Sequence, residues 1–166
     1  SSDLNFEGWG NYASTLFLIL MFIGGCAGST TGGIKIFRFQ ILLKYIAIHL
    51  KKMLQPHAVI ASHFNGRKIQ DSTYESVMIF FFIYILTFAF SALLLSFSGL
   101  DFLTCFSAAA SAISNVGPGL GEIIGPEGNY SSLTSYTKII LIFTMFLGRL
   151  EMLTILVLFL PSFWRN

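Results

Sequence analysis

Apolar residues in this chain form long runs instead of alternating with polar residues. Three runs are long enough to cross a membrane as helices, which takes roughly 20 residues each. They cover about 12–50, 74–97 and 137–163, and a glycine-rich segment interrupts the first of them. A fourth apolar run, 100–113, would reach only about 21 Å as a helix. The pattern therefore predicts three membrane spans, with a shorter helix between the last two.

The short apolar run is followed by Ser-Asn-Val-Gly-Pro-Gly at 114–119, which cannot continue a helix. Gly117 favours other backbone dihedrals and Pro118 has no N–H. A short helix and an irregular loop are typical of a re-entrant hairpin, because non-helical backbone at membrane depth must be buried in protein or line water. A short helix on the membrane surface is the alternative. Asp101 is expected to cap the start of the helix.

Composition excludes an ordinary soluble domain. Charged residues make up 11% of the chain, against about 25% in a typical globular domain. Seven of the ten Lys and Arg residues lie within 35–68, whereas 114–135 has none. The positive-inside rule therefore places 51–73 and the C-terminus in the cytoplasm and 114–135 outside. The net charge of +2 gives no indication of nucleic-acid binding.

The histidines and cysteines suggest no metal site or disulfide. His49, His57 and His63 are spaced by eight and six residues, which fits no compact ligand set, so we expect them to be solvated. Cys26 and Cys105 lie inside apolar stretches and are expected to be small buried side chains. No cofactor is expected.

The turn after the short helix has the composition of an ion filter. A dehydrated cation needs oxygen ligands, and backbone carbonyls provide them without fixed charge. Gly117 permits the dihedral that turns a carbonyl inward, and the negative end of the short helix points at the same place. We expect a potassium ion at the carbonyls of Asn115, Val116 and Gly117. The whole predicted filter is Ser114, Asn115, Val116, Gly117 and Pro118.

A glycine-rich segment, 24–33, interrupts the first run. Each glycine weakens a helix by about 1 kcal/mol relative to Ala, which favours an unwound segment lining an aqueous path. A small-residue helix-packing face remains an alternative. A phosphate-binding loop is excluded because Ile34, and not Lys, follows Gly33. The predicted gate residues in this segment are Gly24, Gly25, Gly28, Ser29, Thr30, Gly32 and Gly33.

Arg149 lies deep in the last apolar run. A charge inside a membrane costs several kcal/mol unless it faces a cavity or a partner. Arg149 and Gly24 each lie about 18 Å along their spans, so we expect them to be level and Arg149 to be part of the gate, opposing a passing cation. A structural bridge without a transport role is the alternative. Lys35 and Glu151 are possible charge partners.

Three segments together resemble the C-terminal part of Trk-type potassium uptake proteins of the Trk/Ktr/HKT superfamily. They are the run Gly24 to Lys35, the segment Ser114 to Leu120, and Gly148-Arg149-Leu150-Glu151. The resemblance covers essentially the whole chain. It implies an all-α polytopic membrane protein built from four repeats around one pore, each with an outer helix, a pore helix, a filter loop and an inner helix.

The resemblance also assigns the parts of this chain. Residues 1–50 would hold the third repeat's inner helix with its intramembrane loop, 24–33, and 51–73 would be a basic cytoplasmic linker. Residues 74–163 would be the complete fourth repeat. Its parts would be the outer helix 74–98, the pore helix 100–113, the filter 114–119, the external loop 120–136 and the inner helix 137–163.

The implied partners are the remaining pore repeats, a second copy in a homodimer, the lipid bilayer and a cytosolic nucleotide-binding regulatory subunit. The implied location is a bacterial inner membrane, and the transported ion would be K⁺. Because one filter loop cannot encircle an ion, we expect either a longer chain or association with another chain. A non-conducting assembly subunit is one alternative. An intramembrane hydrolase is less favoured because Ser29 has no evident base.

Overall fold

The computed structural model describes residues 9–150, except 27, 30, 56–62, 65–66, 69–70, 122 and 127. The described elements are helical apart from one pair of two-residue antiparallel strands. In chain order they are α1 (Asn11–Met21), α2 (Ile36–Leu54), β1 (His63–Phe64), β2 (Arg67–Lys68), α3 (Asp71–Ser96), α4 (Phe102–Ser114), the short 3-10 helix η2 (Tyr130–Ser132) and α5 (Ser135–Arg149).

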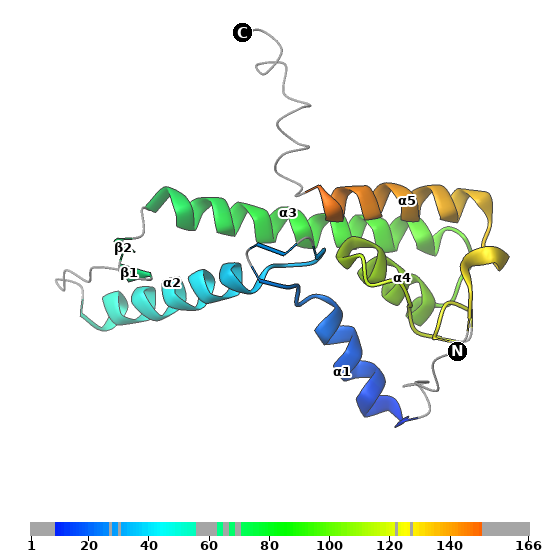
Figure 1. The fold of residues 1–166 in the computed structure, drawn as a ribbon, viewed down its shortest axis with the longest axis horizontal. Coiled ribbons are helices and arrows are strands. Elements are labelled where there is room, and N and C mark those ends of the chain that lie inside the picture. Colours follow the sequence, from blue (N-terminus) through cyan, green and yellow to red (C-terminus); the bar gives the residue numbers. More distant parts are fainter. Residues whose placement is uncertain are drawn as a thin grey trace, which may run out of the picture.

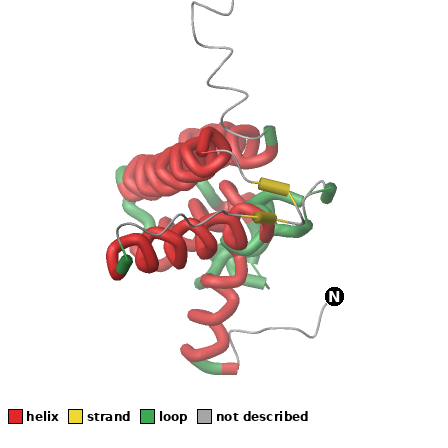
Figure 2. The backbone as a smooth tube through the Cα atoms, turned by 90° about the vertical axis from the view of Figure 1, so that its left-hand side faces the viewer, coloured by secondary structure: helices red, strands yellow, loops and turns green. Residues whose placement is uncertain are grey.

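Helix α4 lies at the centre of the packing. It contacts α3, α5 and α1, while α2 packs along α3. Figure 1 shows α3 and α5 side by side, with α4 against them and α1 directed away from the pair. Figure 2, seen from the end, shows the strand pair, which belongs to the connection between α2 and α3. The residues after α4 therefore lie where several helices meet.

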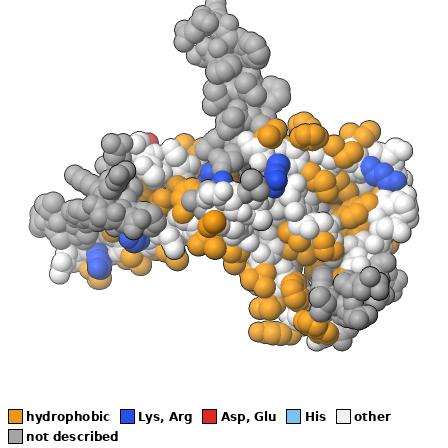
Figure 3. Space-filling model, viewed as in Figure 1, with side chains coloured by type: hydrophobic (Ala, Val, Ile, Leu, Met, Phe, Trp, Pro, Cys, Tyr) orange, Lys and Arg blue, Asp and Glu red, His pale blue; other side chains and the backbone are white. Residues whose placement is uncertain are grey.

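Helix α3 is long and apolar enough to cross a membrane over Ser72–Ser96, and it is the one such helix among the residues described. Large apolar side chains on it, including Phe82 and Phe90, are exposed. Hydrophobic side chains cover much of the face shown in Figure 3. A helix that is apolar all round is suited to lipid or to further protein, not to water.

Of the other two predicted spans, the first differs in form from a single helix, and the last is described only in part. The first is divided into α1 and α2 by the loop at 22–35, where the glycines fall. The last is described as α5 up to Arg149, and residues 151–163 lie outside the described residues. This sequence therefore does not form a continuous helix through the glycine segment.

Helix α4 begins and ends at identifiable signals. Asp101 accepts a hydrogen bond from the Leu103 N–H at 3.3 Å, which confirms the expected N-cap. The helix ends where Asn115 adopts a left-handed conformation, with φ 55° and ψ 42°. Between these ends its small side chains are buried, among them Ala108, Ala109 and Ala112. Small residues let neighbouring helices approach closely.

Hydroxyl pairs join α3 and the turn that follows it to α5. Ser91 bonds Thr144 at 3.0 Å, and Ser98 bonds Thr137 at 2.9 Å. Such bonds between apolar helices contribute about 0.6 kcal/mol each in membrane proteins. They fix α5 relative to α3 and so position the residues at the end of α5.

The two cysteines differ from each other. Cys105 is buried in the cluster that packs α4 against α3 and α5, as expected. Cys26 is exposed, so the expectation of burial is wrong there. It belongs to the unwound loop at 22–35, where an apolar neighbourhood in the sequence does not form a helix face.

Candidate functional site

The turn that follows α4 has an unusual backbone. Asn115 is left-handed, and Gly117 has a φ of 111°. A Cβ atom placed on Gly117 would meet nothing within 4 Å. Glycine is therefore needed at this position for its dihedral angle and not for space. Asn115, Val116, Gly117 and Pro118 are all exposed, in contrast with the buried helix that precedes them.

Serine hydroxyls of α4 hold this turn from behind. The Gly117 N–H donates to Ser111 Oγ at 3.1 Å, and the Val116 N–H donates to the Ser111 carbonyl at 3.0 Å. The Leu120 N–H donates to Ser107 Oγ at 2.9 Å, and the same hydroxyl lies 3.1 Å from the Leu120 carbonyl. Helix α4 thus fixes both the turn and the segment that follows it.

Three side-chain contacts join the turn to other elements. Tyr84 of α3 bonds Ser114 at 2.8 Å, and Asn115 Nδ2 donates to the Met145 carbonyl of α5 at 3.2 Å. The Tyr130 hydroxyl of η2 donates to the Gly117 carbonyl at 2.7 Å. The exposed turn is therefore anchored on three sides.

The glycine-rich segment forms a loop that is closed at its base. The Gly24 N–H donates to the Ile34 carbonyl at 2.9 Å, and the Ile34 N–H donates to the Phe22 carbonyl at 3.1 Å. The Ile36 N–H donates to the Gly25 carbonyl at 3.2 Å. Side chains are excluded inside this base, since a Cβ on Gly24 would lie 2.6 Å from the Gly32 carbonyl oxygen.

The glycine loop and α5 both contact the end of α4 through glycine. A Cβ on Gly32 would lie 2.5 Å from the Ser114 carbonyl oxygen. A Cβ on Gly148 would overlap the carbonyl of Ile113. These two glycines allow backbone to approach backbone, so the loop, the turn and α5 meet at one place.

A cavity of about 550 Å³ lies between the turn and the glycine loop. One wall is formed by Ser114, Asn115, Val116 and Pro118, and the opposite wall by Gly24, Gly25, Thr31 and Gly32. Phe17, Leu20, Met21 and Ile23 complete it. The structure therefore brings most of the predicted filter residues together with much of the predicted gate segment, from positions about 90 residues apart in the sequence.

A second cavity, of about 280 Å³, lies on the other side of the glycine loop. Arg149 lines it together with Ser29, Thr31, Gly33 and Lys35. Arg149 is exposed, and no hydrogen bond within the described part of the chain joins it to the loop's carbonyls. The predicted gate residue Thr30 and the possible charge partner Glu151 lie outside the described residues.

Arg38 lines the same cavity and was not singled out by sequence reasoning. Its side chain is buried, and its guanidinium carbon lies 3.9 Å from the ring centroid of Phe80. This cation–π contact stabilises a charge in an apolar setting. The basic residue at the start of α2 is therefore part of the protein interior.

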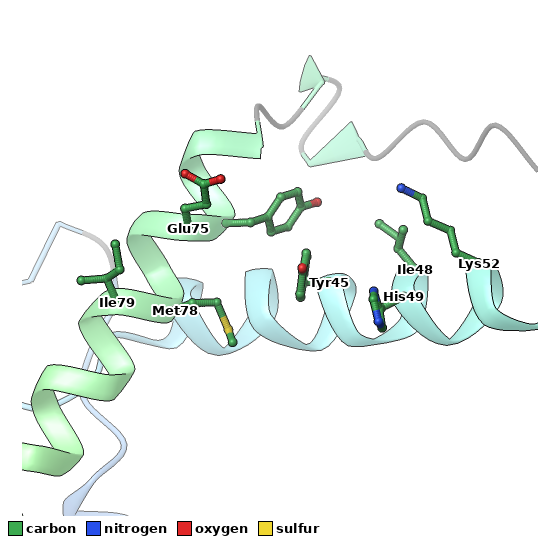
Figure 4. A pocket seen from close by; sticks show the side chains of 8 residues that line it. Tyr45, Ile48, His49, Lys52, Glu75, Met78 and Ile79 are labelled. Atoms are coloured by element: carbon green, nitrogen blue, oxygen red, sulfur yellow. The ribbon is translucent and has the colours of Figure 1, made fainter. Parts of the chain in front are cut away.

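A third cavity, of about 500 Å³, lies between α2 and α3, away from the turn (Figure 4). His49 stacks on Tyr45, with ring centroids 6.0 Å apart, and Lys52 and Glu75 line the same space. No group of three His, Cys, Asp or Glu side chains able to hold a metal occurs in the described ranges. His57 lies outside them.

The fold and site together define a class. An exposed apolar surface, a lipid-length helix and an irregular backbone turn anchored beside a cavity are features of a polytopic membrane protein with a path for a small solute. The chain belongs to the TrkH family of cation transport proteins, whose model matches residues 4–166.

Individual relatives agree with this membership. The chain is 46% identical to the Trk system potassium uptake protein TrkI of Halomonas elongata, over 98% of this chain and 33% of that protein. It is 40% identical to the TrkH protein of Escherichia coli strain K12, over 95% of this chain and 32% of that protein. The crystal structure of the potassium transporter TrkH from Vibrio parahaemolyticus matches with a TM-score of 0.85 and 37% identity, covering 97% of this chain and 34% of that one.

These matches confirm the resemblance inferred from the sequence and the all-α membrane fold. The family is one of cation transport proteins and not of enzymes, so the intramembrane hydrolase has no support. The chain spans about a third of the length of the relatives that it matches.

Sequence reasoning missed the residues that hold the turn. Ser107 and Ser111 recur at spacings of four and three with Ser114, which was predicted as a filter residue, so the three lie on one face of an apolar helix. This signal was available. Nothing in the sequence singles out Tyr84 or Tyr130, because their contacts join residues that are distant along the chain.

Proposed function

We propose that this chain forms one part of a pore that conducts potassium ions across a bacterial inner membrane. The observation that carries the proposal is the cavity shared by the turn at 114–118 and the glycine loop. A path for a cation needs a set of ligands that replaces the ion's hydration shell and a constriction that can block its passage. The two walls of this cavity are candidates for these two roles.

The proposed filter consists of Ser114, Asn115, Val116, Gly117 and Pro118, with the ion at the carbonyls of Asn115, Val116 and Gly117. The exposure of the turn and the positive φ angles of Asn115 and Gly117 support this assignment. The C-terminal end of α4 adds a partial negative charge that favours a cation nearby.

The proposed gate consists of the glycine loop and Arg149, with Lys35 and Glu151 as charge partners. Support comes from the unwound backbone of the loop and from the cavity that Arg149 shares with Ser29, Thr31 and Gly33. A positive charge beside the ion path raises the free energy of a passing cation, as Coulomb's law requires.

We also propose the repeat assignment, in which 1–50 belong to a third repeat and 74–163 to a fourth. A complete pore would need the remaining repeats, which fits the third of its relatives' length that this chain spans. We propose a homodimer with a cytosolic nucleotide-binding regulatory subunit on the side of the basic linker, 51–73.

The test is potassium uptake by the natural full-length product of this gene in bacteria that lack their own uptake systems. We expect growth at low potassium, and we expect Gly117→Ser to abolish it, because serine is strained at a φ of 111°. Gly99→Ser is the matched control, since Gly99 also has a positive φ of 71° with open space around it.

Failure of the unmodified protein to support growth, despite its presence in the membrane, would favour the non-conducting assembly role. Equal growth of the Gly117→Ser and Gly99→Ser variants would count against the filter assignment alone.

A further inference from the structure

The peptide bond between Gly117 and Pro118 has one polar group. Pro118 has no N–H, so the Gly117 carbonyl is the only part of this peptide that can form a hydrogen bond. Pro118 has a fixed φ, but Gly117 has no side chain, and no atom lies within 4 Å of where its Cβ would be. Gly117 therefore has no side chain that restricts its backbone, and a hydrogen bond to the carbonyl can fix the direction in which it points.

Tyr130 provides that bond. Its hydroxyl donates to the Gly117 carbonyl at 2.7 Å, a short and strong geometry for an O–H donor. The tyrosine comes from η2, in the loop between α4 and α5, and its ring packs against the buried cluster that includes Leu95, Ala109 and Leu133. The donor is thus held by the protein core and not by the turn itself.

The preceding peptide, between Val116 and Gly117, is held from α4, because the Gly117 N–H donates to Ser111 Oγ at 3.1 Å. Burial raises the pKa of Tyr130, and the neighbouring Ser111 hydroxyl lowers it only in part. The phenol is therefore protonated at neutral pH, as a donor must be.

We propose that Tyr130 is a positioning residue for ion selectivity, which fixes the direction of the Gly117 carbonyl from outside the ion path. Tyr130 does not line the cavity between the turn and the glycine loop, so it acts through the Gly117 carbonyl, which is the proposed ion ligand. One lone pair of this oxygen binds the phenol and the other remains for a cation. The inference rests on the proposed filter and adds the residue that sets its geometry.

The test is Tyr130→Phe in the natural full-length protein, with potassium and sodium uptake measured in competition. Removing one hydroxyl leaves the ring and its packing in place, so the protein should reach the membrane in normal amount. We expect the ratio of potassium to sodium uptake to fall on the order of fivefold, which corresponds to one ordinary hydrogen bond. Tyr136→Phe is the matched control, because Tyr136 is exposed at the start of α5, and its ratio should not change.

An unchanged ratio in Tyr130→Phe would overturn the inference, even if total uptake fell with the amount of protein. Gly117→Ser separates this outcome from failure of the filter assignment. If Gly117→Ser alters uptake and Tyr130→Phe leaves the ratio unchanged, the filter stands and the role of Tyr130 falls. If neither substitution has an effect, the filter itself falls.

Discussion

At the residue scale, the turn after α4 depends on a few backbone angles that the sequence suggests only in part. Gly117 was predictable, because glycine beside proline after an apolar helix indicates a turn. The left-handed Asn115 is consistent with a residue type that tolerates this region, but its bond to the Met145 carbonyl depends on where α5 packs. Local signals therefore indicate where the turn is, and long-range packing determines its shape.

For Arg149, too, the sequence indicates the position, and long-range packing determines the surroundings. Its depth in the last apolar run predicts a place level with the glycine loop, and the structure puts it in a cavity with Ser29, Thr31 and Gly33. Its neighbour in that cavity, Arg38, was not predictable as a buried residue, because its partner Phe80 lies on α3, 42 residues later along the chain.

We predict that Arg149→Ala raises the resting potassium flux of the full-length protein. Two unit charges about 10 Å apart, at an effective dielectric constant of about 20, repel by roughly 1.7 kcal/mol, and a repulsion of that size corresponds to on the order of a tenfold change in flux. The measurement is rubidium flux into vesicles that contain the purified protein. Arg149→Lys keeps the charge and should stay near the original flux. A flux that is the same in all three proteins would remove Arg149 from the gate.

At the element scale, the apolar runs predict helices well where the run ends at a clear signal. Helix α4 was predicted over 100–113 and extends over Phe102–Ser114, because Asp101 and the Asn-Val-Gly-Pro sequence mark its two ends. Helix α2 continues to Leu54, beyond the end of the apolar run, because Lys51 and Lys52 do not interrupt a helix and are favourable near its C-terminus.

The contact between the glycine loop and the turn was not predictable. Composition indicates that the loop is unwound, but it cannot show that Gly32 lies against the Ser114 carbonyl or that Gly148 lies against Ile113. Both contacts are made by backbone atoms, which leave no trace in hydrophobic periodicity. In the sequence, the glycines therefore indicate only that the backbone is flexible. Their close contacts with other backbone segments can be recognised only in the structure.

We predict that Gly32→Ala strongly reduces potassium uptake. Its added methyl would lie 2.5 Å from the Ser114 carbonyl oxygen, so either the loop or the turn must move, and overpacking of this kind costs about 1–3 kcal/mol. Gly28→Ala is the control within the same loop, because a methyl there meets nothing within 4 Å. Uptake assays and thermal unfolding of the purified full-length variants check both. Similar behaviour of the two variants would mean that the close contact is not needed.

At the scale of the whole molecule, the fold is an arrangement of helices around α4, which itself is too short to cross a membrane. The flanking helices α3 and α5 are joined by hydroxyl pairs, and the exposed apolar side chains of α3 face away from this core. A buried short helix with an exposed turn at its end is the arrangement that the sequence pattern predicts for a re-entrant segment.

The relatives indicate how this unit is used. A crystal structure of a potassium transporter from Vibrio parahaemolyticus contains the same fold in about a third of its length. One turn after one short helix can provide only part of the coordination shell of an ion. In the proposed pore, the other repeats supply the remaining carbonyl oxygens and cover the cavity walls that are open in this chain.

The most direct measurement is anomalous diffraction from crystals of the full-length protein soaked in rubidium, which substitutes for potassium. The account predicts a rubidium peak on the pore axis within coordination distance of the main-chain oxygens of Asn115, Val116 and Gly117. A transporting protein whose rubidium peaks all lie away from this turn would contradict it.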